Sequence, residues 1–313
     1  MQTLTDTPNC AANHAISATL RDGFVLALQA EGRAPKTLRI YLQAVDALLA
    51  FTSERGMPEP SELTAEHLRE FVGHLYAKGN KPATVSNRYR SLHRFFAWLR
   101  DEGERTDNPL ERIKAPRIPE QVLPHYETPE VEALVRSCSA GTYNGTRDRA
   151  IILMLFDCGM RASELVGLQL TDLNAAQGTV LVRGKAGRER IVSMGSRTAL
   201  AVNRFLRVRQ RKGLSGHRAL WVSQRRGPLS VNGLRMLLER RAHAAKVVYK
   251  GIHAFRRTSA MAFLEAGGYP DDLQTLMGWE TSQMLRHYTK ATASGRAVQA
   301  HKRLSPSDRL RLR

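Results

Sequence analysis

The 313-residue sequence is poor in cysteine and has no long apolar run. Its three cysteines, Cys10, Cys138 and Cys158, are widely spaced and form no CxxC pair. This excludes a disulfide framework and a cysteine-based zinc site, and it fits a reducing compartment. No stretch approaches the roughly 20 apolar residues of a membrane span. Residues 1–20 lack a basic start followed by an apolar run, so no secretory signal is expected.

Several motifs of cofactor and metal enzymes are also missing. The segment "GKAG" (184–187) lacks the spacing of a P-loop, and no GxGxxG opens a helix. There is no HExxH, and the carboxylates are not grouped as a two-metal nuclease requires. We therefore expect neither a metal nor a cofactor. If the protein acts on phosphodiesters, side chains must neutralise their charge.

Acidic residues are scarce relative to basic ones. Forty-eight Lys and Arg stand against 29 Asp and Glu, which gives a net charge of +19, and the excess runs from residue 33 to the C-terminus. Such a charge predicts an acidic polymer as partner, with nucleic acid as the first candidate. An anionic membrane surface is the weaker alternative, because no strongly amphipathic basic helix stands apart from the rest.

The first half of the chain reads as a helical domain over residues 17–107, preceded by a loose tail over 1–16. Apolar residues at helical spacing predict helices over 36–56, 64–79 and 81–103. The last of these also carries a basic cluster, for which contact with phosphates and a solvated basic face are equally good explanations. Its members, with the lysine just before the helix, are Lys81, Arg88, Arg90 and Arg94.

A proline-rich linker is predicted over residues 108–127. Four prolines in this stretch favour an extended, semi-rigid connection. Lys114 and Arg117 lie within it and suit contact with a DNA backbone.

The second domain is predicted over 128–304 and a basic tail over 305–313. Helices are expected over 129–139 and 146–158, a strand pair over 178–195, and mostly helix thereafter. The fold class is therefore mainly α with a small β-sheet (α+β). Arg188 near the strand turn is a further candidate for DNA contact.

The segment "HAFRR" (253–257) suggests chemistry on a phosphate. A helix places His253 and Arg256 on one face, because positions i and i+3 are neighbours. Arginine is permanently charged and binds two phosphate oxygens through its planar fork. Alone, HxxR is a weak signal, and a surface histidine beside a surface arginine explains it equally well. Its surroundings strengthen it, because other basic and aromatic motifs follow in order along the chain.

Those motifs resemble the conserved boxes of the tyrosine recombinase family, also called phage-type integrases. The segments are "RDRAIILMLFDCGMRASELVGL" (147–168), "VRGKAGRERIVSMG" (182–195), "HAFRRTSAMAFLEAGG" (253–268) and "LQTLMGWETSQMLRHYT" (273–289). The resemblance covers about residues 20–290 and is closest to the simple, Xer-like architecture. It implies a helical, SAM-like core-binding domain followed by a catalytic domain of the DNA breaking-rejoining type.

The resemblance also implies roles for individual residues. The two family arginines fall on Arg161 and Arg256, the lysine of the strand turn on Lys185, and the nucleophile on Tyr288. His253 falls on the histidine of HxxR. The family usually has a second histidine where this chain has Trp279, which keeps an N–H donor but cannot exchange a proton. Glu164 reads as an ion-pair partner that orients Arg161.

The activity implied is site-specific recombination of double-stranded DNA through a 3′-phosphotyrosine, by a homo-tetramer on two DNA sites with a dimer on each. The resemblance implies neither a membrane nor a small-molecule substrate as partner. A cytoplasmic, nucleoid-associated location is expected, and the position of the core-binding region predicts no amino-terminal arm-binding domain. Two alternatives remain open at this point. One is a type IB topoisomerase that relaxes DNA, and the other is a DNA-binding regulator that does not cleave.

Overall fold

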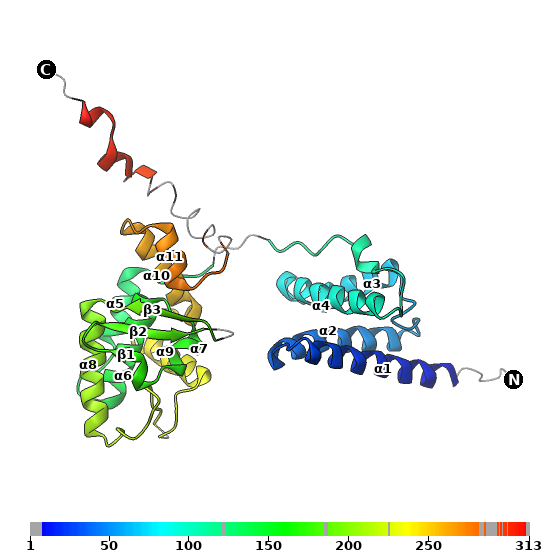
Figure 1. Cartoon of the computed structure of the whole chain (residues 1–313), viewed down its shortest axis with the longest axis horizontal. Coiled ribbons are helices and arrows are strands. Elements are labelled where there is room, and N and C mark those ends of the chain that lie inside the picture. The colour runs from blue at the N-terminus through cyan, green and yellow to red at the C-terminus, as the bar shows by residue number, and fades with distance from the viewer. Residues whose placement is uncertain are drawn as a thin grey trace. The chain divides into compact units, whose positions relative to one another are not determined.

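A computed structural model describes residues 8–119, 123–184, 187–224, 226–281 and 300–310, together with residues 285, 293, 295, 297 and 298. The chain divides into two compact units, Met1–Gln121 and Val122–Arg313 (Figure 1). Each unit has its own buried apolar core. In the described part of the chain no helix is long and apolar enough to cross a membrane.

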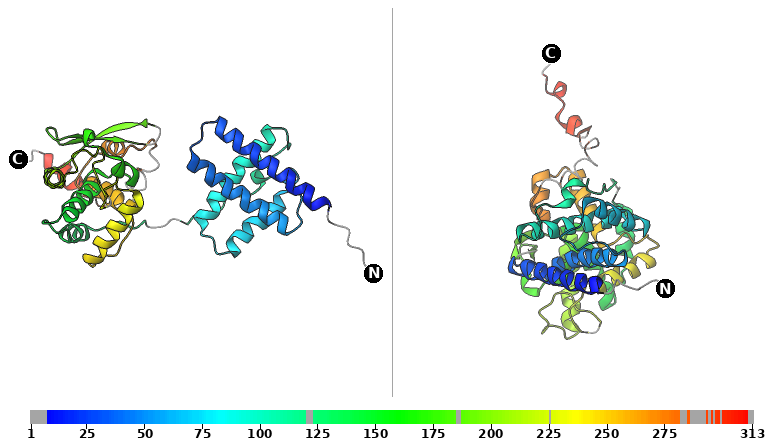
Figure 2. Two further views of the ribbon diagram at one scale, coloured as in Figure 1. Left: turned by 90° about the horizontal axis from the view of Figure 1, so that it is seen from below. Right: turned by 90° about the vertical axis from the view of Figure 1, so that its right-hand side faces the viewer.

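The N-terminal unit is a helical bundle (Figure 2). Its elements are α1 (Pro8–Ala30), α2 (Pro35–Glu54), α3 (Ala65–Ala77), α4 (Pro82–Asp101) and the 3₁₀ turn η1 (Pro109–Arg112). Pro35 and Pro82 occupy the first helical positions of α2 and α4, where proline's missing N–H costs nothing. The core contains aromatic residues from all four of these helices, and Phe24 packs edge-to-face on Phe95 at 5.2 Å between ring centroids.

Two predictions for this unit are wrong in detail. Helix α1 begins at Pro8, inside the stretch that was expected to be a loose tail. The first turns are rich in alanine, which favours helix without any amphipathic pattern, so periodicity gave no signal there. The start of the linker is also not extended. Tyr89 Oη donates hydrogen bonds to the carbonyls of Leu110 (2.9 Å) and Ile113 (2.8 Å), which hold η1 against α4.

The C-terminal unit surrounds helix α6, which packs against α5, α8 and α10. Its helices are α5 (Thr128–Arg136), α6 (Tyr143–Cys158), α7 (Ala162–Gly167), α8 (Ser196–Arg211), α9 (Val231–Ala244), α10 (Ile252–Glu265) and α11 (Pro270–Met277), with 3₁₀ turns η2 (Leu170–Asp172) and η4 (Ser307–Arg309). Arg257 Nε donates to the carbonyl of Pro124 (2.7 Å), and Tyr126 N donates to Thr258 Oγ1 (2.8 Å). These bonds fix the chain entering this unit onto α10.

A small antiparallel sheet has the order β1 (Leu173–Asn174), β2 (Thr179–Arg183), β3 (Glu189–Ser193). Val180 pairs with Val192, and Val182 with Arg190, in the predicted hairpin. Strand β1 was not predicted, because two residues are too short to show an alternating pattern. The fold is mainly helical with a small sheet, so the predicted fold class is confirmed.

Candidate active site

Arg161 lies at the junction of α6 and α7. Helix α6 ends at Gly159, whose φ of 57° is left-handed and suits glycine. The chain then turns sharply, and Arg161 becomes the residue before the first turn of α7. Its side chain is 39% exposed while that of Glu164 is 2% exposed. Arg161 thus presents its guanidinium at the surface from a fixed backbone.

Glu164 receives hydrogen bonds from two arginines. Arg161 donates to it from the backbone N (2.8 Å) and from Nη1 (2.7 Å), and Arg190 donates from Nη1 (3.0 Å) and Nη2 (2.8 Å). Burial alone would raise the pKa of Glu164, but these hydrogen bonds outweigh it and lower the pKa to about 2. Glu164 is therefore a fixed anion that orients Arg161, as the sequence predicted.

Arg256 on α10 is buried and binds two segments that are distant in sequence. Nη1 donates to the carbonyl of Gly159 (2.7 Å), and Nη2 donates to the carbonyl of Met277 (2.5 Å). Its guanidinium carbon also lies 5.6 Å from the ring centroid of Trp279. These contacts bring the end of α6, helix α10 and the end of α11 to one point.

His253 lies one helical turn before Arg256, with its ring at the surface. Partial burial, together with the guanidiniums of Arg257, Arg256 and Arg161, lowers the pKa of His253. The imidazole is therefore neutral at pH 7 and is able to accept a proton. His253 also lies close to the turn before Arg161, because Arg256, one helical turn further on, donates to the carbonyl of Gly159.

The structure therefore brings together four of the predicted residues: Arg161, Arg256, His253 and Trp279. Trp279 is buried, in a cluster that also includes Leu285. Lys185 and Tyr288 lie outside the described residues, and the described hairpin ends at Gly184 and resumes at Gly187. Among the described residues, no three His, Cys, Asp or Glu side chains are arranged to hold a metal ion.

The sequence missed the role of Arg190 in this site. The side chain of Arg190 is only 13% exposed and faces Glu164 and the end of α11. Its position on β3, directly after the turn, carried no signal of this contact. The partner Glu164 lies 26 residues earlier and becomes a neighbour only through the fold.

The candidate DNA-contacting side chains of the N-terminal unit differ in whether they already have a partner within the protein. Arg94 forms an ion pair with Glu31, and Arg90 donates to Asn87. The side chains of Lys81 and Arg88 make no hydrogen bond or ion pair within the described residues, and Lys81 is exposed.

The remaining candidates lie in the linker and on the hairpin. Lys114 and Arg117 are exposed. Arg188 forms an exposed ion pair with Glu280 at 2.6 Å. Such a surface pair contributes little to stability and leaves the guanidinium able to exchange partners.

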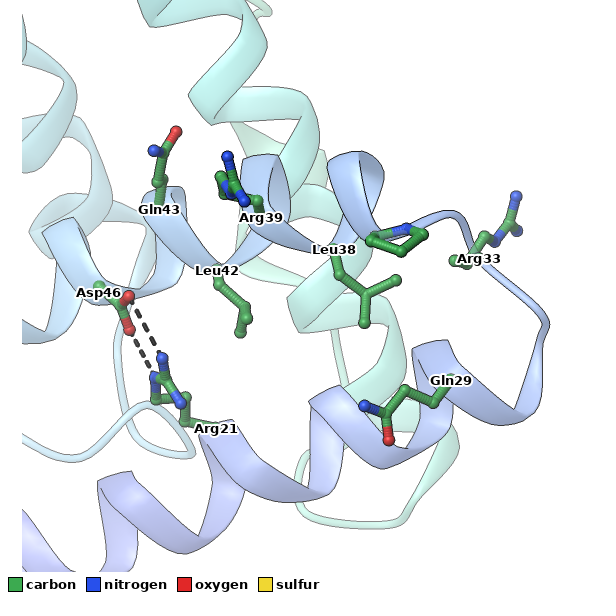
Figure 3. Close-up of a pocket in the computed structure, with 9 residues that line it drawn as sticks. Arg21, Gln29, Arg33, Leu38, Arg39, Leu42, Gln43 and Asp46 are labelled. Carbon is green, nitrogen blue, oxygen red and sulfur yellow. Dashed lines mark hydrogen bonds and ion pairs between the residues drawn. The ribbon is translucent and has the colours of Figure 1, made fainter. Parts of the chain in front are cut away.

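A groove between α1 and α2 is lined by polar side chains that are further candidates for DNA contact (Figure 3). The sequence analysis did not single them out. Arg39 and Gln43 lie one turn apart on α2 and are both exposed, while Arg21 across the groove is held by Asp46 at 2.6 Å. Within the described residues the side chain of Arg39 makes no hydrogen bond or ion pair. In the sequence, only the four-residue spacing of Arg39 and Gln43 indicates that the two side chains share one face of the helix.

Comparison of the sequence with known protein families gives two matches. The sequence model of the "Phage integrase family" matches residues 126–294, which is more than half of the chain, and that of the "Phage integrase, N-terminal SAM-like domain" matches residues 20–103. The chain belongs to the phage integrase family.

Relatives within the phage integrase family extend over most of the chain. The tyrosine recombinase XerC of Oceanobacillus iheyensis is 30% identical over 277 residues, which cover 87% of this chain and 91% of that protein. The tyrosine recombinase XerC of Thermodesulfovibrio yellowstonii is 30% identical over 266 residues, covering 83% and 87%.

Solved structures of phage integrases and Xer recombinases share the fold. XerH site-specific recombinase, in a post-cleavage complex with a palindromic difH substrate, matches with a TM-score of 0.70 and 18% identity over 93% of this chain and 85% of that one. A lambda integrase tetramer bound to a Holliday junction matches with a TM-score of 0.68 and 18% identity over 87% and 76%. Together with the family match, the prediction of a tyrosine-type site-specific recombinase is confirmed.

Proposed function

We propose that this phage integrase cleaves and rejoins strands of double-stranded DNA at specific sites through Tyr288, with a 3′-phosphotyrosine as intermediate. The observation that carries the proposal is the convergence of Arg161, Arg256, Trp279 and His253 at one point of the C-terminal unit. Phosphoryl transfer requires stabilisation of negative charge and transfer of protons, and the side chains gathered here are able to do both.

Charge stabilisation falls to the two arginines and to Trp279. In the transition state, negative charge develops on the non-bridging oxygens of the scissile phosphate. Arg256 is held by two backbone carbonyls and Arg161 by Glu164, so both guanidiniums are oriented before DNA binds. Preorganised donors of this kind stabilise the transition state without any cost of reorganisation at the moment of reaction. The Trp279 N–H adds one further donor.

Proton transfer falls to His253 and Lys185. As the oxygen of Tyr288 forms a bond to phosphorus, the phenol proton passes to the neutral imidazole of His253. As the bond from phosphorus to the 5′ oxygen breaks, that oxygen takes a proton from the ammonium of Lys185. The bond energy is conserved in the phosphotyrosine, so a new 5′ hydroxyl is joined by the reverse reaction without ATP.

Partners and assembly follow from the same proposal. The helical unit holds duplex DNA with its basic side chains, which include Lys81, Arg88, Arg90 and Arg94. Lys114 and Arg117 contact the backbone from the linker, and Arg188 from the hairpin. Four subunits act on two DNA sites. The similarity to a lambda integrase tetramer bound to a Holliday junction supports this stoichiometry.

A nicked suicide substrate tests the proposal. Such DNA loses a short strand after cleavage, so the covalent intermediate accumulates. The wild-type protein is expected to form an adduct that resists denaturant, and peptide mapping is expected to locate it at Tyr288. Tyr288→Phe removes one oxygen and little packing, so it is expected to bind DNA but form no adduct. An adduct formed by Tyr288→Phe would identify another nucleophile and overturn the assignment. Relaxation of supercoiled plasmid of unrelated sequence would instead support a type IB topoisomerase.

A further inference from the structure

Arg190 connects three elements of the candidate active site. It extends from β3, and its Nε donates to the carbonyl of Leu276 at the end of α11 (2.8 Å). Its two terminal nitrogens donate to the two carboxylate oxygens of Glu164, at 3.0 Å and 2.8 Å. Such a paired arrangement fixes both the position and the plane of the carboxylate.

Glu164 passes this orientation on to Arg161. The same two oxygens that accept from Arg190 also accept from Nη1 and the backbone N of Arg161. With Arg190 removed, the carboxylate would lose two of these four hydrogen bonds and would be held only by Arg161 itself. Arg161 would then be paired with an anion that no other described residue fixes in place.

The contacts of Arg190 are directed into the protein and not toward DNA. Its side chain is 13% exposed, and all three of its nitrogens already donate to protein oxygens. The backbone of Gly278 also lies close to it, because a Cβ built there would be 3.2 Å from Arg190 Cδ. An effect of Arg190 on cleavage must therefore act through a neighbouring residue.

We propose that Arg190 is a positioning residue that aligns the guanidinium of Arg161 with the scissile phosphate by fixing the plane of Glu164. The inference rests on the proposed strand-cleavage chemistry. A rival route exists on the same hairpin, because Arg190 also anchors β3 to α11, and this hairpin carries Lys185 in its turn. The two routes predict different chemical defects.

Two modified suicide substrates separate these routes. A methylphosphonate at the scissile position replaces one charged non-bridging oxygen with a methyl group, which reduces the need for Arg161. A bridging sulfur at the 5′ position provides a leaving group that departs without a proton, which removes the need for Lys185. Arg161→Ala and Lys185→Ala calibrate the two rescues.

Arg190→Gln is expected to cleave ordinary DNA roughly 10- to 100-fold more slowly than wild type, as outer residues that orient a functional group commonly do. On methylphosphonate DNA the deficit is expected to shrink to within about threefold of wild type, and on the sulfur-substituted strand it is expected to persist. Glu164→Gln should show the same pattern. The double variant should be no slower than the slower single variant, because both act on one interaction.

Arg183→Gln is the matched control on the same hairpin. Arg183 pairs with Asp172 and Glu189 and has no bond to Glu164 or α11 in the described residues. Its cleavage rate is expected to stay within about threefold of wild type on all substrates, because in the described part of the chain neither of its partners contacts Arg161, Glu164 or α11. The carboxylate of Asp172 is buried, so any cost of losing Arg183 is expected in the free energy of unfolding rather than in the rescue pattern.

If only the sulfur-substituted strand restores the cleavage rate of Arg190→Gln, Arg190 acts through Lys185. If neither modified substrate restores the rate, Arg190 does not align Arg161. Either result overturns the proposal. Thermal unfolding shows whether each variant is folded, and Arg190→Lys replaces Arg190→Gln if the latter is not. If neither variant folds, the role of Arg190 is structural and the proposal is wrong. Wild type that forms no adduct on ordinary DNA would instead contradict the proposed function itself.

Discussion

Arg256 and Gly159 are 97 residues apart in the sequence and are joined by a 2.7 Å hydrogen bond from Nη1 to the glycine carbonyl. The same guanidinium reaches the carbonyl of Met277. One buried side chain therefore holds the turn before Arg161 and the turn before Trp279. The folding of the site and its charge distribution depend on the same residue.

Arg256→Lys is expected to damage both properties. An ammonium is a single point donor and cannot reach both carbonyls in the plane that the guanidinium fork satisfies. We expect a loss of about 1–3 kcal/mol in the free energy of unfolding, because a buried carbonyl loses its charged donor. Strand cleavage on the suicide substrate is expected to fall at least ~100-fold. Arg257→Lys, one position away, loses only an exposed hydrogen bond to the carbonyl of Pro124. Its cleavage rate should stay within about twofold of wild type, and its free energy of unfolding within about 1 kcal/mol. Equal effects of the two substitutions would contradict the assignment.

The pH dependence of cleavage is expected to follow His253. Its lowered pKa keeps the imidazole neutral at pH 7, so cleavage should be constant near neutrality and fall only as the pH drops below about 6.5. Arg257→Ala removes one of the nearby cations, so the pKa of His253 rises and the fall begins at a higher pH. Rates measured at pH 5.5 relative to pH 8 should therefore be lower for Arg257→Ala, by roughly twofold or more, than for wild type.

Arg257→Lys keeps the positive charge and serves as the control for this profile. It should follow the wild-type curve, since the charge rather than the shape of residue 257 affects the imidazole. His253→Gln should be slow and lack this acidic fall. A profile that Arg257→Ala leaves unchanged would show that another group titrates.

Glu164 is expected to make stability depend on acid. Its pKa is lowered from 4.5 to about 2 in the folded protein, so its stabilising contribution is complete above about pH 5. The contribution is lost as the pH falls from there towards 2, because the unfolded chain takes up the proton first. The full contribution is on the order of 3 kcal/mol. The free energy of unfolding, measured in urea, falls between pH 7 and pH 3, and this fall should be about 2 kcal/mol smaller for Glu164→Gln than for wild type. Equal losses would place the titration elsewhere.

Gly145 on α6 is expected to tolerate no side chain. A Cβ there would lie 1.9 Å from the carbonyl oxygen of Ser139, and backbone cannot yield as a flexible side chain does. Gly145→Ala should destabilise the protein by about 2–4 kcal/mol through overpacking. At Gly141 a Cβ would meet no atom within 4 Å, so Gly141→Ala should change stability by less than about 0.5 kcal/mol. Denaturant unfolding of the two variants checks the difference.

Local signals in the sequence were sufficient for most of the helices and for the hairpin. Pro82 at the first turn and apolar residues at helical spacing defined α4, and glycines on both sides of the turn separated β2 from β3. Where such signals are weak the predictions were wrong. Alanine-rich α1 has no amphipathic stripe at its start, and β1 is too short for alternation.

The sequence by itself determined the type of protein and the residues expected to do its chemistry, because motif order, spacing and charge are properties of the chain. It placed Arg161, His253 and Arg256 as candidates before any geometry was known. Only the tertiary structure decided how these side chains are held. Arg190 meets Glu164 and Leu276, and Arg256 meets Gly159 and Met277, across separations that leave no periodic trace. Hydrogen bonds to backbone carbonyls are invisible in a sequence because every residue carries a carbonyl, and the fold alone selects which of them a guanidinium reaches.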